Sequence, residues 1–177
     1  MNKRIGRLLW AAALLLLAAV LLLVNRPEGK PAPDPGSQVG EQLPDFTVQC
    51  VDGSNFTLSE QRGKVVVINL WATWCTPCVR ELPNFDRLLR ERSEEVAVLA
   101  LHCPPVTTDV AAYLKDYDYL MPFAVDEDGS LGELLNASTV LPQTIILDAD
   151  GVVTYNREGS LRYEELVSLV EEAGGKD

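Results

Sequence analysis

The sequence predicts an α/β domain in which helices cover both faces of a central mixed sheet, behind an N-terminal β-hairpin. Three observations predict this fold class. Two nearly continuous apolar runs, residues 65–70 (VVVINL) and 96–101 (VAVLAL), are typical of strands buried on both faces. A segment with apolar residues at helical spacing connects them. A hairpin signal and a last helix follow, which together give a mixed sheet.

The first predicted elements lie before and within the first apolar run. Residues 46–51 alternate between apolar and polar, and Asp52-Gly53 is typical of a turn. Residues 55–58 are expected to form the returning strand of a short hairpin. The polar break at residues 62–64 separates this hairpin from the strand at 65–70. The β-branched residues of that strand suit a central position in the sheet.

Helices alternate with strands from there on. A helix is expected from Cys75 to about Arg92, because its apolar residues fall on one stripe. The strand at 96–101 follows, and then a second helix over residues 109–119. Residues 123–125 form a short strand and residues 131–135 a helical turn.

The sequence of the C-terminal part of the domain predicts a hairpin and a helix. Strands at residues 144–147 and 152–155 flank the turn sequence DADG. The last helix covers residues 163–173 and is closed by Gly174-Gly175. These elements complete the mixed sheet.

Length and charge limit the functions that the chain can have. The chain has 177 residues, enough for one domain and an N-terminal extension at ~150 residues per domain. Its formal net charge is −11, which argues against sequence-independent binding of nucleic acid. No glycine-rich loop suggests a nucleotide site. We expect no nucleic-acid partner and, for one domain on one tether, a monomer.

The extension has the features of a membrane anchor. Residues 8–24 form an uncharged apolar run that follows Lys3, Arg4 and Arg7. At ~1.5 Å per residue a helix of this run spans roughly 25 Å, near the lower limit for crossing a bilayer. It is long for a signal peptide, and no small-residue cleavage site follows it. We expect residues 1–24 to be an uncleaved signal anchor, with a cleaved signal peptide as the alternative.

A tether joins the expected anchor to the domain. Residues 25–40 contain four prolines and three glycines, which favour an extended, solvated segment. The globular domain is then expected at residues 41–177. The positive-inside rule keeps the basic N-terminus in the cytoplasm and places this domain outside it, as a single-pass membrane protein.

The chemistry of the chain is concentrated in the sequence Cys75-Thr76-Pro77-Cys78. Cys75 falls at the N-terminus of a helix, where unpaired N–H groups and the helix dipole stabilise a thiolate. One helical turn brings Cys78 alongside, close enough to form a disulfide. We therefore expect Cys75 to be the nucleophile, Cys78 the resolving thiol, and their redox-active disulfide to replace any cofactor.

Two neighbours of the cysteine pair are further candidates. Glu81 lies three positions after Cys78 and could move the proton of the resolving thiol; the alternative is a solvated helix residue. Trp74 precedes Cys75 and is expected to shield the disulfide and to offer a contact surface. Thr76-Pro77 is expected to tune the reduction potential.

The sequence WATWCTPCVRELP resembles the active-site motif of thioredoxin-fold proteins, in particular the membrane-anchored TlpA/ResA-like thiol–disulfide oxidoreductases. The similarity covers roughly residues 39–172. It extends to residues 44–46, 63–64, 141–144 and 159–160. The resemblance implies a thioredoxin-like fold and thiol–disulfide exchange as the activity.

The resemblance also assigns roles to residues outside the cysteine pair. The family carries a cis-proline before its penultimate strand, and Pro142 matches it. It implies that Pro142 faces the cysteine pair and that the backbone of Leu141 pairs with an extended substrate. Glu81 matches an acidic residue implicated in thiol acid–base chemistry. Gln143 stands where threonine is frequent. Substrate contacts are expected from Trp74, Thr76, Pro77 and Leu141.

The family's activity implies a reductant that works outside the cytoplasm. Its electrons would come through a membrane thiol–disulfide carrier. Its substrates would be oxidised cysteine pairs in exported proteins, such as the haem-attachment CxxCH of an apocytochrome c or a metalloprotein assembly factor. The alternative is a disulfide-forming oxidase of the same fold, because direction depends on reduction potential and partner.

Two other functional classes are weaker. A copper or zinc chaperone could use Cys75, Cys78, His102 and Cys103, but a zinc site of this kind is not expected on a helix behind a buried strand. A peroxiredoxin-like peroxidase lacks its PxxxTxxC pattern.

Cys50 and Cys103 are left open. They could form a second disulfide or could be small buried apolar residues. Cys103 could also lie near Cys75.

Overall fold

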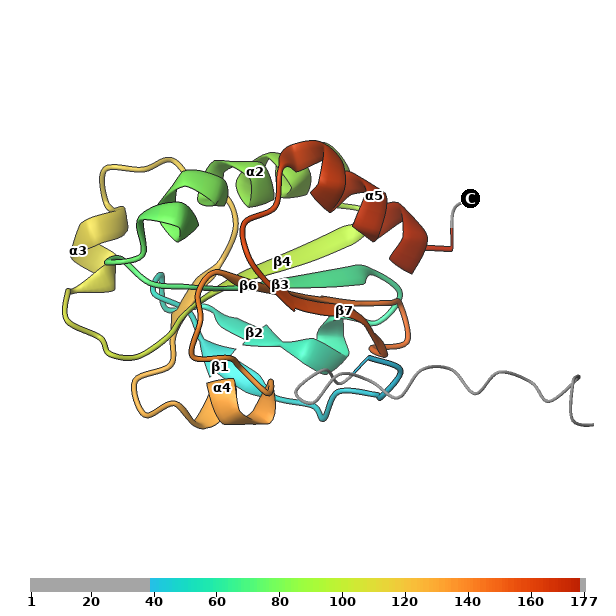
Figure 1. Ribbon diagram of the computed structural model, residues 1–177, viewed down its shortest axis with the longest axis horizontal. Coiled ribbons are helices and arrows are strands. Elements are labelled where there is room, and N and C mark those ends of the chain that lie inside the picture. Colours follow the sequence, from blue (N-terminus) through green and yellow to red (C-terminus); the bar gives the residue numbers. More distant parts are fainter. Residues whose placement is uncertain (1–38, 176–177) are drawn as a thin grey trace, which may run out of the picture. The chain divides into compact units, whose positions relative to one another are not determined.

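The computed structural model describes residues 39–175, in which a five-stranded mixed sheet lies between two layers of helices and loops (Figure 1). The strand order is β5-β4-β3-β6-β7. Strands β3, β4 and β5 are parallel, whereas β6 runs antiparallel to its two neighbours, β3 and β7. The strands are β3 (Val65–Trp71), β4 (Val96–His102), β5 (Phe123–Val125), β6 (Gln143–Leu147) and β7 (Val153–Glu158). This confirms the predicted α/β class and the mixed sheet.

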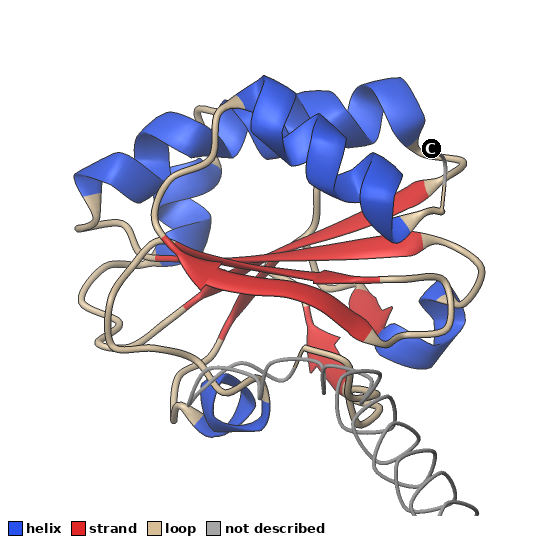
Figure 2. Ribbon diagram, turned by 45° about the vertical axis from the view of Figure 1, so that its right-hand side comes forward, coloured by secondary structure: helices blue, strands red, loops and turns tan. Residues whose placement is uncertain are grey.

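Helices α2 (Thr76–Arg92) and α5 (Tyr163–Ala173) lie together on one face of this sheet (Figure 2). The short helix α3 (Val110–Leu114) packs into the same core. The opposite face is covered by the N-terminal hairpin of β1 (Thr47–Gln49) and β2 (Asn55–Thr57) and by α4 (Ser130–Leu134) (Figures 1 and 2). A 3₁₀ turn at Leu58–Gln61, which the sequence did not predict, joins this hairpin to β3.

The alternation of side chains along β3 explains both layers. Val65, Val67 and Trp71 belong to the core under α2 and α5, and Val66, Ile68 and Leu70 to the core on the other side. All seven residues of β3 are buried. Burial of a side chain of this size contributes roughly 1.5–3 kcal/mol, so β3 is a large source of stability.

The predicted membrane anchor lies outside the described residues, as does most of the predicted tether. Within residues 39–175, no helix is long and apolar enough to cross a bilayer.

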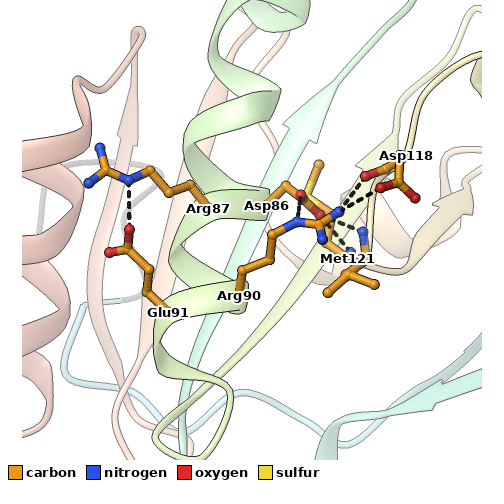
Figure 3. Close-up of polar contacts among 7 residues, drawn as sticks. Asp86, Arg87, Arg90, Glu91, Asp118 and Met121 are labelled. Atoms are coloured by element: carbon orange, nitrogen blue, oxygen red, sulfur yellow. Dashed lines mark hydrogen bonds and ion pairs between the residues drawn. The ribbon is translucent and has the colours of Figure 1, made fainter.

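The second predicted helix is shorter than expected. The pattern at residues 109–119 predicted a helix, but α3 ends at Leu114. The Asp86 carboxylate on α2 accepts hydrogen bonds from the N–H groups of Leu120 (2.5 Å) and Met121 (3.1 Å). It also accepts one from Nε of Arg90 (2.6 Å), which contacts Asp118 as well (Figure 3). These contacts hold the chain after α3 in a loop against α2.

We expect Asp86→Ala to destabilise the fold. The substitution leaves the N–H groups of Leu120 and Met121 without their acceptor, which costs roughly 2–4 kcal/mol for the two groups. Glu91→Gln is the matched control, because its ion pair with Arg87 in Figure 3 is exposed and contributes little to stability. Urea unfolding measures both variants. Equal losses for the two would contradict the role given to Asp86.

Candidate active site

The two cysteines of the motif form a disulfide at the start of α2. Cys75 is the N-cap of the helix, and its Sγ accepts a hydrogen bond from the N–H of Cys78 (3.3 Å). The two Cα atoms are 5.3 Å apart. Cys78 has no exposed surface, whereas Cys75 is 5% exposed. An approaching sulfur can therefore reach Cys75 but not Cys78.

The backbone between β3 and α2 explains why Cys75 stands at the helix end. β3 stops at Trp71, and the N–H of Cys75 donates to the carbonyl of Ala72 (3.1 Å), which closes a turn. Pro77 lies in the first helical turn, where its missing N–H costs no hydrogen bond. The N–H of Cys78 in the first helical turn then points toward the Cys75 sulfur, as the sequence predicted for the helix start.

Glu81 is a buried carboxyl one turn after Cys78. Its Oε1 accepts a hydrogen bond from Nδ2 of Asn69 (2.8 Å), and its Oε2 accepts one from the N–H of Leu161 (3.0 Å). Burial raises the pKa of Glu81 to about 7, although the two hydrogen bonds oppose this rise. The alternative of a solvated helix residue is therefore wrong. At neutral pH this carboxyl can both take up and release a proton.

The sequence did not identify the two partners of Glu81. Asn69 lies inside the apolar run of β3. Its polarity in that run is the one sequence feature that could have indicated a partner for Glu81. It points to the helical face of the sheet, like Val67 and Trp71. Leu161 contributes only its backbone, which no residue pattern can reveal.

The Leu141–Pro142 peptide bond is cis, as the resemblance implied. Gln143, which follows, pairs with Leu70 near the end of β3. Pro142 therefore lies at the end of the sheet where β3 stops and the chain continues into Cys75. The carbonyl of Pro142 accepts a hydrogen bond from the N–H of Gly159 (2.8 Å), which joins this loop to the end of β7.

Gln143 holds the loop that carries Pro142. Its buried side chain accepts a hydrogen bond from the N–H of Ser138 (2.6 Å) and donates one to Oδ1 of Asn156 (2.5 Å). Sequence reasoning noted this residue only as a departure from the family pattern. The longer amide side chain reaches both the loop and β7, which a threonine at this position is too short to do.

Exposed side chains surround Cys75. Trp74 is 51% exposed, and its Nε1 donates a hydrogen bond to the carbonyl of Pro105 (3.2 Å). Thr76 and Pro77 are exposed and Leu141 is half-buried. Trp74 thus offers an apolar surface beside the disulfide, and its link to Pro105 holds the ring in one orientation.

The structure does not form the metal site that the sequence left open. His102 packs against Trp71 on the helical face of the sheet, whereas Cys103 belongs to the core on the opposite face. The two side chains therefore cannot bind one ion together with the Cys75–Cys78 pair. Among residues 39–175 there is no group of three or more possible metal ligands.

Cys50 and Cys103 are free and buried. Cys50 lies opposite Ala124 of β5, which in turn lies opposite Leu101 of β4. Two strand spacings, about 9.6 Å, therefore separate Cys50 from the strand that Cys103 follows, beyond the ~7 Å limit for a disulfide. Burial raises the pKa of both thiols, that of Cys103 to about 12, so neither forms a thiolate readily.

Comparisons with known proteins agree with this geometry. The profile of the Redoxin family matches residues 38–171. The thioredoxin-like protein YneN of Bacillus subtilis is 33% identical over 134 residues, covering 74% of this chain and 78% of that protein. The thiol-disulfide oxidoreductase ResA of Bacillus cereus is 29% identical over 162 residues, covering 91% and 93%.

The fold is also found among solved structures. The exposed lipoprotein thioredoxin Etrx1 of Streptococcus pneumoniae superposes with a TM-score of 0.67 at 27% identity. The alignment covers 73% of this chain and 99% of that one. The predicted resemblance to thioredoxin-like thiol–disulfide oxidoreductases is confirmed.

We expect Glu81→Gln to remove most of the pH dependence that Glu81 gives to the stability of the oxidised protein. The pKa of Glu81 is raised to about 7 in the folded protein, so the fold favours the neutral carboxyl. The resulting contribution to stability is complete at a pH below the ordinary pKa of glutamate. That stability is lost as the pH rises through 7. Glutamine stays neutral, so between pH 5 and pH 8 the variant should lose about 1–3 kcal/mol less stability than wild type.

Urea unfolding at pH 5 and pH 8 measures this difference. Glu94→Gln is the control, because Glu94 is exposed. If wild type and Glu81→Gln showed the same change in stability between the two pH values, the raised pKa would be refuted.

Proposed function

The chain belongs to the Redoxin family and is a thiol–disulfide oxidoreductase, and we propose that it acts outside the cytoplasm, mainly as a reductant of disulfides in exported proteins. The observation that carries this proposal is the pairing of a reachable Cys75 at a helix N-terminus with a buried Cys78. One sulfur meets the substrate and the other resolves the intermediate. The uncharged run at residues 8–24, preceded by three basic residues, supports an extracytoplasmic domain.

The reaction begins with the reduced pair. The Cys75 thiolate attacks one sulfur of the substrate disulfide, the substrate S–S bond breaks, and the second substrate sulfur leaves as a thiolate. The N–H of Cys78, which contacts Sγ of Cys75 in the disulfide, is placed to stabilise the Cys75 thiolate before attack. The product is a mixed disulfide between Cys75 and the substrate.

Glu81 serves the second step. Its carboxylate accepts the proton of the Cys78 thiol, and the resulting thiolate attacks Sγ of Cys75. The Cys75–Cys78 bond forms while the mixed disulfide breaks, and the substrate leaves as a dithiol. Two electrons pass from the cysteine pair to the substrate. One substrate thiolate takes the proton held by Glu81, and the other takes a proton from solvent. A pKa of about 7 suits a group that takes up and returns a proton at neutral pH.

The surface around Cys75 supports a protein substrate. We propose that the substrate lies extended along Leu141 beside cis-Pro142 and against the exposed ring of Trp74, with Thr76 and Pro77 next to the reacting sulfur. By resemblance, substrates are oxidised CxxCH segments of apocytochrome c or cysteine pairs of metalloprotein assembly factors. A membrane thiol–disulfide carrier returns the two electrons.

We expect the full chain to reduce an oxidised CxxCH peptide and the Cys78→Ser variant to stop at the mixed disulfide. Cys78→Ser keeps the nucleophile but lacks the resolving sulfur, so it accumulates a covalent complex that mass spectrometry detects. Cys75→Ser should form none, because Cys78 is buried.

Cys103→Ala is the control for cysteine loss. Its thiol belongs to the core on the far face of the sheet, so turnover with dithiothreitol as donor should stay within about twofold of wild type. A mixed disulfide that formed equally in both single-serine variants would overturn the assignment of roles. A peptide that stayed oxidised with wild type would overturn the substrate class.

A further inference from the structure

His102 is the one histidine of the chain and lies buried behind the active-site segment. It ends β4 directly beside Trp71 of β3. The two rings meet edge to face, with centroids 5.1 Å apart and planes at 78°. The reaction derived above does not use this imidazole, and the separation of His102 from Cys103 excludes a shared metal site.

We propose that neutral His102 is a positioning residue, which holds the segment that leads into Cys75 in its reactive place. The backbone N–H of Thr73 donates a hydrogen bond to Nε2 of His102 (3.0 Å), and the Thr73 hydroxyl lies 3.4 Å from the same atom. An acceptor nitrogen carries no proton, so the proton of the neutral ring sits on Nδ1. This inference rests on the proposed function of Cys75 as nucleophile.

The contact acts where the chain leaves the sheet. Residues 72–75 connect β3 to α2 and have no strand partner of their own. The carbonyl of Trp71 accepts a hydrogen bond from the N–H of Cys103 (2.8 Å). The next hydrogen bond that ties this segment to β4 is the one from Thr73 to Nε2 of His102. Thr73 is thus fixed two residues before Cys75. The position of Sγ relative to the helix N–H groups depends on this anchor.

The surroundings of the ring favour its neutral form. Burial lowers the pKa of His102. Trp71 faces it from β3, with Tyr113 of α3 packed behind that indole. Directly after β5, the N–H of Asp126 donates to the His102 carbonyl, while the Asp126 carboxylate accepts hydrogen bonds from the N–H groups of Leu131 and Gly132.

A charged ring could not make the Thr73 contact. Among the described residues, Nε2 of His102 is hydrogen-bonded only to Thr73 and the buried Nδ1 has no hydrogen-bond partner, so no carboxylate is bonded to the imidazole. The neighbouring Cys103 thiol, with its raised pKa, brings no negative charge. An imidazolium carries a proton on both nitrogens, so it would lose the hydrogen bond from Thr73 and release the segment.

Two substitutions separate this role from simple packing. In His102→Gln the amide oxygen can reach the position of Nε2 and accept from Thr73, whereas the amide of His102→Asn ends near the position of Nδ1. The readout is the alkylation rate of Cys75 by iodoacetamide in the reduced full chain, measured against pH. This rate follows the thiolate fraction of Cys75.

We expect the alkylation rate of His102→Asn below the thiol pKa to fall about tenfold, equivalent to a rise of one unit in the pKa of Cys75. His102→Gln should stay within about twofold of wild type. Equal rates for Asn and Gln, whether both reduced or both normal, would overturn the proposal. The alkylation assay needs no protein substrate, so failure of this proposal is distinguishable from failure of the proposed function.

The wild-type chain gives an independent test that needs no variant to fold. Because the chain has one histidine, its ¹⁵N-labelled imidazole gives a single pair of nitrogen resonances. We expect an unprotonated Nε2 and a protonated Nδ1 at neutral pH, and a midpoint of titration below the ordinary value for histidine. A protonated Nε2 at neutral pH would contradict the proposal.

Discussion

The pairing of β3 with its two neighbours is the interaction on which the active site depends. β3 is buried along its whole length between β4 and β6, so its end is fixed on both sides. From β4 comes His102, which accepts the hydrogen bond from Thr73. The loop with cis-Pro142 precedes β6, and the pairing of Gln143 with Leu70 holds it at the end of β3. A slip of one residue in either register would move these groups away from Cys75.

Polar groups are buried under the helical face of the sheet, and their hydrogen bonds offset the cost of removing them from water. The Glu81 carboxyl is held by Asn69 and by the backbone of Leu161, which joins β3 and the start of α5 to the centre of α2. These contacts do not cancel the loss of hydration, and the pKa of Glu81 consequently rises. The same burial that fills the core therefore places a carboxyl with a pKa of about 7 one helical turn after Cys78, where we propose that it accepts the proton of the resolving thiol.

The sequence predicted the parts of the fold and site that arise from local patterns. The apolar runs gave β3 and β4, and the cysteine spacing gave a disulfide at a helix start. Contacts between distant residues were not accessible in this way. The loop that follows α3 is held by Asp86, which lies on another helix and whose carboxylate accepts hydrogen bonds from the N–H groups of Leu120 and Met121. The orientation of His102 required the sheet register, which places it opposite Trp71 and separates it from Cys103.

The reduction potential of the Cys75–Cys78 pair tests the central claim most directly. The full chain is equilibrated in dithiothreitol or glutathione redox buffers, and tryptophan fluorescence follows the transition, with Cys75→Ser as control. The account predicts one two-electron transition near the thioredoxin value of about −270 mV or below, absent in the control. A potential near about −120 mV would make the protein a disulfide-forming oxidase. The absence of a transition in wild type would contradict redox chemistry at this site altogether.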